Sequence, residues 1–199
     1  YIEWGMLPQS ETFFIDPLGF CADSVLSKDL SWVNKNDITQ MHNKRDELRA
    51  KYTIDPQGYV LVPLQIENDT QILQHSHYNN MEEFVEYVEH MYPKNKILVK
   101  RHPRSPKKRK FKRAELVDFN TDLLELASKA EVVVGITSTS LYECGILGVP
   151  VVALGDCPLR INKKENTEKV LAGACVLNIN RRTGNIRPIM ERFGIHPNL

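Results

Sequence analysis

The sequence predicts an α/β protein built on a Rossmann-like, doubly wound parallel sheet. From residue 36 onward, short apolar runs alternate with segments of helical length, and strands separated in this way form right-handed crossovers in a sheet that is covered on both faces. A basic turn at residues 100–103 and a hydroxyl-rich turn at residues 137–140 each follow an apolar run. Ligands of open α/β sheets bind at such positions, outside the carboxyl ends of the strands.

The first half of this alternating region contains two helices and two strands. Residues 37–52 have apolar side chains at helical spacing, and the segment ends before a turn cluster at residues 55–58. Residues 59–64 form an apolar run typical of a buried parallel strand. Residues 81–91 repeat apolar side chains with acids between them, and Pro93 closes this second helix. A second strand is expected around Ile97.

The second half repeats the pattern. We expect a helix at residues 121–129, a strand at 132–134, a helix at 140–147 and a strand at 149–154. Gly148 and Pro150 are typical of a helix end followed by a new strand.

The first 35 residues do not follow this rhythm. Residues 13–15 are apolar and precede a turn at residues 16–19, which indicates short strands and turns. The chain begins at Tyr1 without an initiator Met, so we expect a segment of a longer protein. We interpret residues 1–35 as a bridge from a missing or preceding N-terminal domain, and residues 36–199 as a Rossmann-like nucleotide-sugar-binding domain.

Composition excludes several classes of protein. The 199 residues carry a formal charge of +1, which argues against extended binding to polyanions, and no nucleic-acid motif is present. The four cysteines lack C-x-x-C spacing and are expected to be buried thiols in a reducing compartment. No apolar stretch approaches the roughly 20 residues that cross a bilayer, and no secretion signal is evident. We therefore expect a cytoplasmic protein, with peripheral attachment to the inner membrane left open.

The first turn contains Arg101 and His102, followed by Pro103. Pro103 biases His102 into an extended conformation that ends the strand and aims the imidazole across the carboxyl edge of the sheet. His102 would then be a donor or a cation beside a phosphate, or a structural histidine. The segment 101–113 has eight Lys or Arg residues and no acid, and it is either an electropositive wall, with Arg101 nearest the site, or a solvated mobile loop.

The second turn opens a predicted helix with Ser138, Thr139 and Ser140, whose hydroxyls and backbone N–H groups suit a phosphate. Glu143 follows within the helix. Ser140 and Glu143 match the capping-box pattern, so Glu143 either caps the helix or accepts both hydroxyls of a ribose.

The loop at residues 65–71, after the first strand, is mostly polar and contains Gln65, Asp69 and Gln71. A carboxylate at this edge could be the nucleophile or base of a glycosyl transfer, in which two carboxylates commonly flank the reacting centre. The alternative is a polar Asx-turn loop. His75 and His77 lack a nearby Cys or Asp partner, so no metal site is predicted.

These motifs together resemble the bacterial capsule and lipopolysaccharide Kdo transferases, which are retaining β-Kdo glycosyltransferases. The resemblance rests on the loop at 65–71, the basic turn, the hydroxyl turn with Glu143, and residues 148–151, and it spans about residues 3–155. The His-Pro and Ser/Thr motifs are also similar to those of bacterial sialyltransferases. Thr137 and Thr139 interleave with the serines where the family often has a plain serine pair.

The resemblance implies a GT-B architecture, of which this chain would be the C-terminal, nucleotide-binding half. It further implies transfer of Kdo from CMP-Kdo to a capsule or O-antigen glycan. His102 and residues 138–140 would hold the phosphate, and Glu143 the ribose. Asp69 and Glu3 would be the two catalytic carboxylates, and Gln65, Gln71 and Arg101 would contact sugar or phosphate.

No cofactor or metal is expected, and the implied partners are a CMP-sugar donor, a glycan or glycolipid acceptor and a capsule-assembly complex at the membrane. Two alternatives remain open. One is a sialyltransferase-like or other nucleotide-sugar transferase, and the other is a non-catalytic nucleotide-sugar-binding module of a larger capsule-synthesis protein.

Overall fold

The computed structural model describes residues 1–78, 80–105, 109–118 and 120–195. Its strands form one sheet of five and one of three. The five-stranded sheet contains β3 (Tyr59–Pro63), β4 (Lys96–Lys100), β5 (Glu115–Val117), β6 (Ala130–Gly135) and β7 (Val151–Ala153), and the three-stranded sheet contains β1 (Ile2–Trp4), β2 (Thr12–Ile15) and β8 (Asn178–Asn180).

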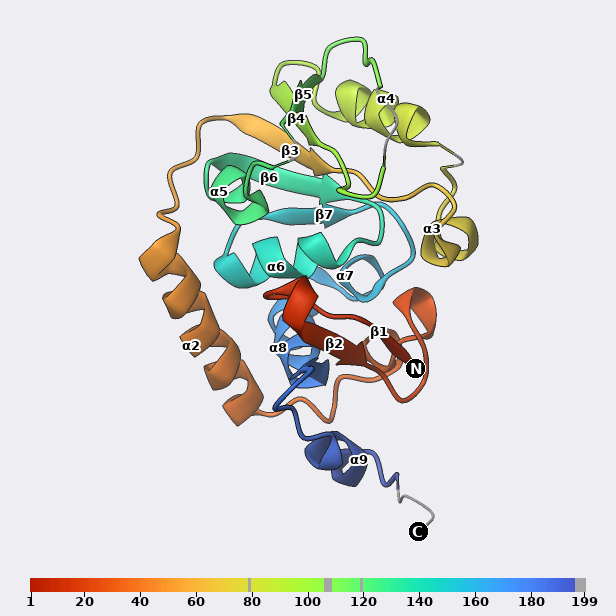
Figure 1. The fold of residues 1–199 in the computed structure, drawn as a ribbon, viewed down its shortest axis with the longest axis vertical. Helices are drawn as coiled ribbons and strands as arrows, with labels where there is room; N and C mark the ends of the chain where they lie inside the picture. Colours follow the sequence, from red (N-terminus) through yellow and green to blue (C-terminus); the bar gives the residue numbers. More distant parts are fainter. Residues whose placement is uncertain (79, 106–108, 119, 196–199) are drawn as a thin grey trace.

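The helices lie between and around these strands (Figure 1). They are α1 (Val25–Lys28), α2 (Lys35–Lys51), α3 (Thr70–His75), α4 (Met81–Met91), α5 (Leu123–Ser128), α6 (Thr139–Leu147), α7 (Pro158–Ile161), α8 (Thr167–Leu177) and α9 (Arg187–Arg192). Short 3-10 turns occur at Gln9–Glu11, Cys21–Asp23 and Lys164–Asn166.

The larger sheet has the strand order β5-β4-β3-β6-β7, and every neighbouring pair is parallel. The chain starts in the middle of the sheet at β3, moves outward to β4 and β5, and then returns to β6 and β7 on the other side. The direction of winding therefore reverses between β3 and β6, which is the point where doubly wound sheets bind ligands. The predicted fold class is confirmed.

Alternate side chains of β3 build two separate cores, because successive residues of a strand point to opposite faces. Val60 and Val62 pack in a cluster with α3 and α4, and Tyr59 and Leu61 pack in a cluster with α5 and α6. Figure 1 shows α4 at one side of the sheet and α6 at the other. All five residues of β3 are buried, as expected for the central strand of a covered parallel sheet.

A third layer lies on the outer side of α6. It contains the antiparallel sheet, with α2 and α8 beside it (Figure 1), and its core joins Met6 and Leu26 of the first segment to Leu171 and Leu177 of α8. β1 pairs with β2, and β2 pairs with β8, so the two ends of the chain meet in one sheet. Residues 1–34 thus share a hydrophobic core with the C-terminal helices.

The helix ends follow local sequence signals. Asn34 and Asp37 form a capping box at the start of α2, which places the first turn two residues before the predicted start. Gly148 ends α6 in the left-handed region at φ 98°, and its N–H donates to the carbonyl groups of Cys144 and Gly145. This conformation favours glycine, because a side chain there would be strained.

Candidate functional site

The two predicted turns and the predicted loop lie together at the carboxyl edge of the larger sheet. Gln65 follows β3, and Thr137 follows β6. The Gln65 amide spans the point where the winding reverses: its Nε2 donates to Thr137 Oγ1 at 3.1 Å, and its Oε1 accepts from the Thr137 N–H at 3.0 Å. Gln65 therefore ties the two loops together.

A cleft of about 670 Å³ opens at this edge. Its walls come from the segment before β2, from α2, from the ends of β3 and β4, and from the N-terminal ends of α5 and α6. The lining residues include Leu7, Pro8, Ser10, Lys44, Leu48, Lys51, Tyr52, Pro63, Leu64, Lys100, Arg101, His102, Pro103, Asp122, Leu123, Leu124, Ser138, Thr139, Ser140 and Glu143. The predicted nucleotide-binding residues thus all face one cleft, together with Arg101.

A smaller hollow of about 110 Å³ adjoins the cleft. The two share His102, Ser138 and Thr139 as lining residues. The smaller hollow is lined by Glu3, Trp4, Gln65, Ile66, Asp69, Gln71, His102, Arg104, Ser138 and Thr139. The structure therefore brings both predicted catalytic carboxylates and both predicted glutamine contacts to the far side of His102, away from Glu143.

His102 is held as a neutral hydrogen-bond donor. The backbone N–H of Arg104 donates to His102 Nδ1 at 3.1 Å, so the proton of the neutral ring is on Nε2. Burial lowers the pKa of His102, and the charge of Arg104 lowers it further. Of the two phosphate-side roles considered for His102, this geometry fits the donor and not the cation.

The hydroxyl turn forms the N-terminus of α6. Ser138 is the N-cap, and its Oγ accepts from the Ser140 N–H at 3.2 Å. The first N–H groups of a helix lack partners within the helix, and together with the helix dipole they attract anions. The alternative reading of Ser140 and Glu143 as a capping box is wrong, because Ser138 is the N-cap and Ser140 lies inside α6.

Glu143 has a role that neither sequence reading included. Its Oε1 accepts a hydrogen bond from the Leu7 N–H at 2.9 Å, and burial raises the pKa of its carboxyl group. Leu7 has a φ of 56°, which is uncommon for a side chain of this size. Glu143 therefore anchors the segment that forms one lip of the cleft.

Asp69 and Glu3 each make a local hydrogen bond. Asp69 is the N-cap of α3, and its Oδ1 accepts from the Gln71 N–H at 2.9 Å. Glu3 Oε1 accepts from the Trp4 N–H at 2.9 Å. Asp69 is exposed, and its charge acts on the pKa of His102 in the raising direction. Each carboxylate has a second oxygen with which to act on a ligand.

Lysines from two elements add charge to the cleft. Lys44 and Lys51 come from α2 and were not predicted from the sequence, and Lys100, the first residue of the basic turn, comes from the end of β4. Burial lowers the pKa of Lys100, as expected for a cation partly removed from water. The sequence does contain a pattern that groups the cleft residues of α2, because residues 44, 48 and 51 have the spacing of one helix face.

The basic segment matches neither sequence reading along its whole length, because Arg101 lines the cleft and most of the later cations that the structure describes are exposed. Residues 106–108 lie outside the described residues, but Arg109 is buried and forms a salt bridge with Glu67 Oε1 at 2.8 Å and another with Glu82. Lys112 pairs with Glu86 of α4. From Arg109 onward the segment is not a wall of the cleft. Acids of α4 and of the loop before α3 pair with Arg109 and Lys112, whereas Lys110, Lys112 and Arg113 remain exposed, as the reading as a solvated segment expects.

Two other predictions concern metals and thiols. In the described part of the chain, no group of three or more His, Cys, Asp or Glu residues is placed to hold a metal ion. The four cysteines are free, three of them are buried, and burial raises the pKa of each thiol. Among the described helices, none combines the length and apolar character needed to cross a membrane.

Comparisons with known proteins show the family and the fold of this chain. Residues 30–158 match the family described as capsule polysaccharide biosynthesis protein. The chain belongs to this family. It is 29% identical to Protein FixF of Sinorhizobium fredii, in an alignment that covers 78% of this chain and 42% of FixF. The chain therefore spans less than half the length of that curated relative.

Two solved structures share the fold. The β-Kdo 2,7 transferase KpsC of Thermosulfurimonas dismutans has a TM-score of 0.71 and 22% identity, covering 98% of this chain and 77% of that chain. The β-Kdo 2,4 transferase KpsC of the same organism has a TM-score of 0.66 and 18% identity, covering 96% and 77%. This chain therefore has the same fold as these two transferases.

Proposed function

We propose that this chain is the nucleotide-binding half of a glycosyltransferase that transfers Kdo from CMP-Kdo to a capsule or O-antigen glycan or glycolipid. One observation carries the proposal: the large cleft and the smaller hollow meet at His102, Ser138 and Thr139. A phosphate at this junction would have the nucleoside on one side and the sugar on the other. The family and the KpsC-like fold support the same reaction class.

The phosphate would be bound by neutral donors and by a surrounding positive field. His102 Nε2–H and the first N–H groups of α6 would donate to its oxygens, and Lys100, Arg101, Lys44 and Lys51 would lower the energy of its charge. These groups stabilise departing CMP most, because negative charge on the phosphate grows as the bond to the sugar breaks. The proposal therefore includes no metal ion.

The sugar would occupy the smaller hollow, between the two carboxylates. In a retaining double displacement, Asp69 attacks the anomeric carbon and the bond to the phosphate oxygen breaks, so that CMP leaves with the electron pair. Glu3 then takes the proton of an acceptor hydroxyl, which displaces Asp69 from the anomeric carbon. Gln65 and Gln71 lie beside the sugar in this arrangement.

Calorimetric titration with CMP, UDP and GDP tests the donor. We expect CMP to bind more tightly than the other two nucleotides. We also expect His102→Ala and Ser138→Ala to weaken CMP binding about 10- to 100-fold while leaving cytidine binding nearly unchanged, because a charge-assisted hydrogen bond is worth about 1.5–3 kcal/mol. Equal affinity for the three nucleotides would remove CMP as the donor nucleotide and leave a nucleotide-sugar transferase of another donor class.

The second candidate is a non-catalytic nucleotide-sugar-binding module of a larger capsule-synthesis protein. It is favoured by the position of Asp69, which already caps α3 and is exposed, as an ordinary loop carboxylate would be. This candidate predicts CMP binding without transfer in the full-length protein. Measured turnover of CMP-Kdo would exclude it.

A further inference from the structure

Beside the smaller hollow, two arginines are held against one tryptophan. The guanidinium carbon of Arg104 lies 5.5 Å from the centre of the Trp4 ring, and that of Arg181 lies 4.9 Å from it. Arg181 is also 4.7 Å from the centre of the Phe13 ring. Contacts of this kind attract a cation to an aromatic face. We call Trp4, Phe13, Arg104 and Arg181 the arginine–tryptophan stack.

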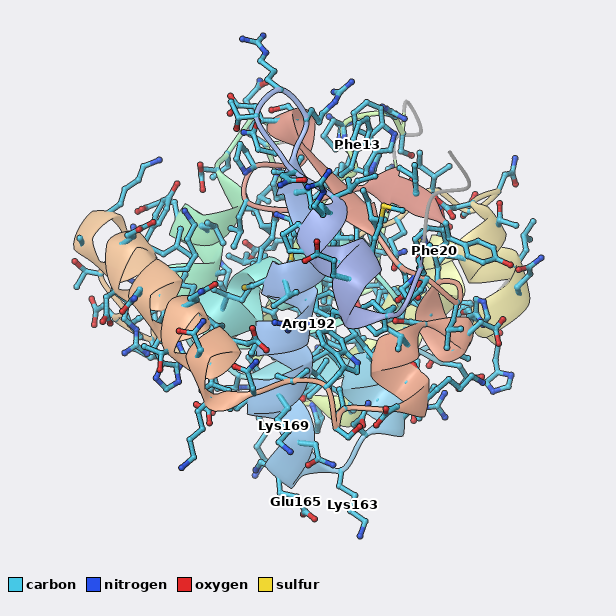
Figure 2. All side chains as sticks on the ribbon, turned by 90° about the horizontal axis from the view of Figure 1, so that it is seen from below. Phe13, Phe20, Lys163, Glu165, Lys169 and Arg192 are labelled. Atoms are coloured by element: carbon cyan, nitrogen blue, oxygen red, sulfur yellow. The ribbon has the colours of Figure 1, made fainter. Side chains whose placement is uncertain are left out.

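The backbone of the small antiparallel sheet holds the stack together. Trp4 of β1 is opposite Phe13 of β2, and Phe13 is opposite Ile179 of β8, so that Arg181 emerges just after β8 beside both rings. Arg181 Nη1 donates to the Ser10 carbonyl at 3.1 Å. Figure 2 labels Phe13 on the side of the molecule where β2 and the segment after β8 come together. The guanidinium is thus fixed before any ligand arrives.

The charge of these arginines is not neutralised within the described part of the chain. Arg104, Arg181 and the neighbouring Arg182 are exposed, and the ion pairs found among the described residues do not include them. Arg109 and Arg192, by contrast, are paired with carboxylates. A guanidinium that stacks by its face keeps its edge N–H groups for a carboxylate, which it can bind with two parallel hydrogen bonds.

The stack lies between two hollows. Trp4 and Arg104 line the 110 Å³ hollow that contains Asp69. Another hollow of about 430 Å³ is lined by Phe13, Arg181 and Arg182, together with Ser10, Asn180 and one acid, Glu11. The two hollows share no lining residue, and the Trp4 and Phe13 rings, whose centres are 6.3 Å apart, stand between them. A ligand that contacts both must be longer than one sugar.

We propose that the arginine–tryptophan stack and Arg182 form an acceptor subsite that binds the carboxylate groups of an acidic oligosaccharide. The inference rests on the proposed function, because it assigns the 110 Å³ hollow to the donor sugar and the path over the stack to the acceptor. The acceptor chain extends from the Glu3 side of the 110 Å³ hollow across Trp4 into the 430 Å³ hollow, with its carboxylates against the arginines. The donor's own sugar carboxylate is the alternative ligand of Arg104.

Trp4 fluorescence provides a local signal. In the Trp32→Phe variant, Trp4 is the only tryptophan. We would titrate this variant with trigalacturonate and with its fully methyl-esterified form. The ester is the control because it lacks the charge of the carboxylates. We expect saturable binding of the acid and at least 10-fold weaker binding of the ester. Arg181→Gln should weaken binding of the acid about 10-fold or more, whereas Arg187→Gln, an exposed control at the start of α9, should not.

Three results would overturn the subsite: equal binding of acid and ester, equal effects of Arg181→Gln and Arg187→Gln, or displacement of bound trigalacturonate by CMP. Displacement by CMP would place the acid in the donor cleft instead. If Arg181→Gln still binds trigalacturonate and Arg104→Gln does not, the carboxylate is bound on the donor side. Titration with CMP alone tests the proposed donor separately. If the protein binds trigalacturonate through Arg181 but does not bind CMP, the proposed function is wrong and the acceptor subsite stands.

Discussion

At the scale of single residues, His102 illustrates how a local pattern and a tertiary contact combine. The Pro that follows it and the strand that precedes it place His102 at the sheet edge, which the sequence indicates. Its tautomer depends on the Arg104 N–H at Nδ1, and its lowered pKa depends first on burial. Glu143 shows the opposite case, since its partner Leu7 is distant in sequence and no motif connects the two.

The first prediction concerns the pH dependence of stability. The pKa of His102 is lowered in the folded chain and is about 6.5 in the unfolded chain, so between these values the unfolded chain binds more protons. Stability from neutral His102 is therefore fully present above pH 7 and is lost as the pH falls through 6.5 toward the folded pKa. Between pH 7.5 and 5.5, we expect the melting temperature of the parent to fall more than that of His102→Gln. Parallel curves would contradict the prediction.

The second prediction separates catalysis from structure at Asp69. Asn is as good an N-cap as Asp, so Asp69→Asn should preserve α3 while removing the nucleophile. In the full-length protein we expect transfer to fall by about 1,000-fold or more, with CMP affinity within a few-fold of the parent. Intact-mass analysis after incubation with CMP-Kdo should detect a glycosyl adduct on Asp69 in the parent.

Asp118→Asn is the matched control. Asp118 is also exposed, and its Oδ1 also accepts from the N–H of the residue two positions further on, Asn120. It lines neither the cleft nor the 110 Å³ hollow. The control should transfer at the parent rate. If Asp69→Asn keeps most of its turnover and no adduct can be trapped, Asp69 is only a helix cap.

At the scale of elements, the loop of Asp69 and the segment after His102 are joined by a buried ion pair. Arg109 comes from the basic segment, and Glu67 comes from the loop at residues 65–71; their side chains are 3% and 13% exposed. Glu67 Oε1 also accepts from the Met81 N–H at the start of α4 at 2.9 Å. The pair thus fastens two site loops to one helix, and a run of like charges in the sequence cannot reveal these partners.

The third prediction is that Arg109→Met destabilises the chain by about 3 kcal/mol, because it leaves the largely buried Glu67 carboxylate without its cation. Lys110→Met is the control, since Lys110 is exposed and should change stability by less than about 0.5 kcal/mol. Urea denaturation measures both. The double variant Arg109→Met with Glu67→Leu should recover part of the loss, and its failure to do so would show that packing of Arg109 matters more than its charge.

At the scale of the whole molecule, one core joins the two ends of the chain. Leu26 from the first segment and Leu171 and Leu177 from α8 are buried in the same cluster as Ile146 of α6. At the far end, Arg192 of α9 pairs with the buried Asp37 of α2 at 2.7 Å, and Arg192 is labelled in Figure 2. The antiparallel sheet and the parallel sheet therefore pack on opposite sides of α6.

The fourth prediction follows from this shared core. Leu26→Ala should destabilise the chain by about 2–5 kcal/mol, and the whole chain should still unfold in one transition. Near-ultraviolet and far-ultraviolet circular dichroism on heating should give coincident curves. Early melting of the first segment alone, with the sheet melting as in the parent, would show that residues 1–35 form a separate unit.

The sequence by itself determined the parallel sheet. Short apolar runs indicate buried strands, and longer segments with apolar side chains at helical spacing indicate the helices between them. α4 was predicted with both its ends, because acids lie between its regularly spaced apolar side chains and Pro93 closes it. β5 was not predicted. It has only three residues at the sheet edge, two of them exposed, so it carries no apolar run to recognise.

The tertiary structure decided what depends on distant partners. Sequence placed Asp69, His102 and Ser138 at one edge, because the carboxyl ends of parallel strands must share it. It did not show that these residues border the cleft or the 110 Å³ hollow beside it. Nor did it show that Glu143 accepts a hydrogen bond from Leu7, or that Arg104 and Arg181 stack on Trp4. Strand and helix periods are local properties of the chain, whereas hollows, ion pairs and ring contacts arise only when segments far apart in sequence pack together.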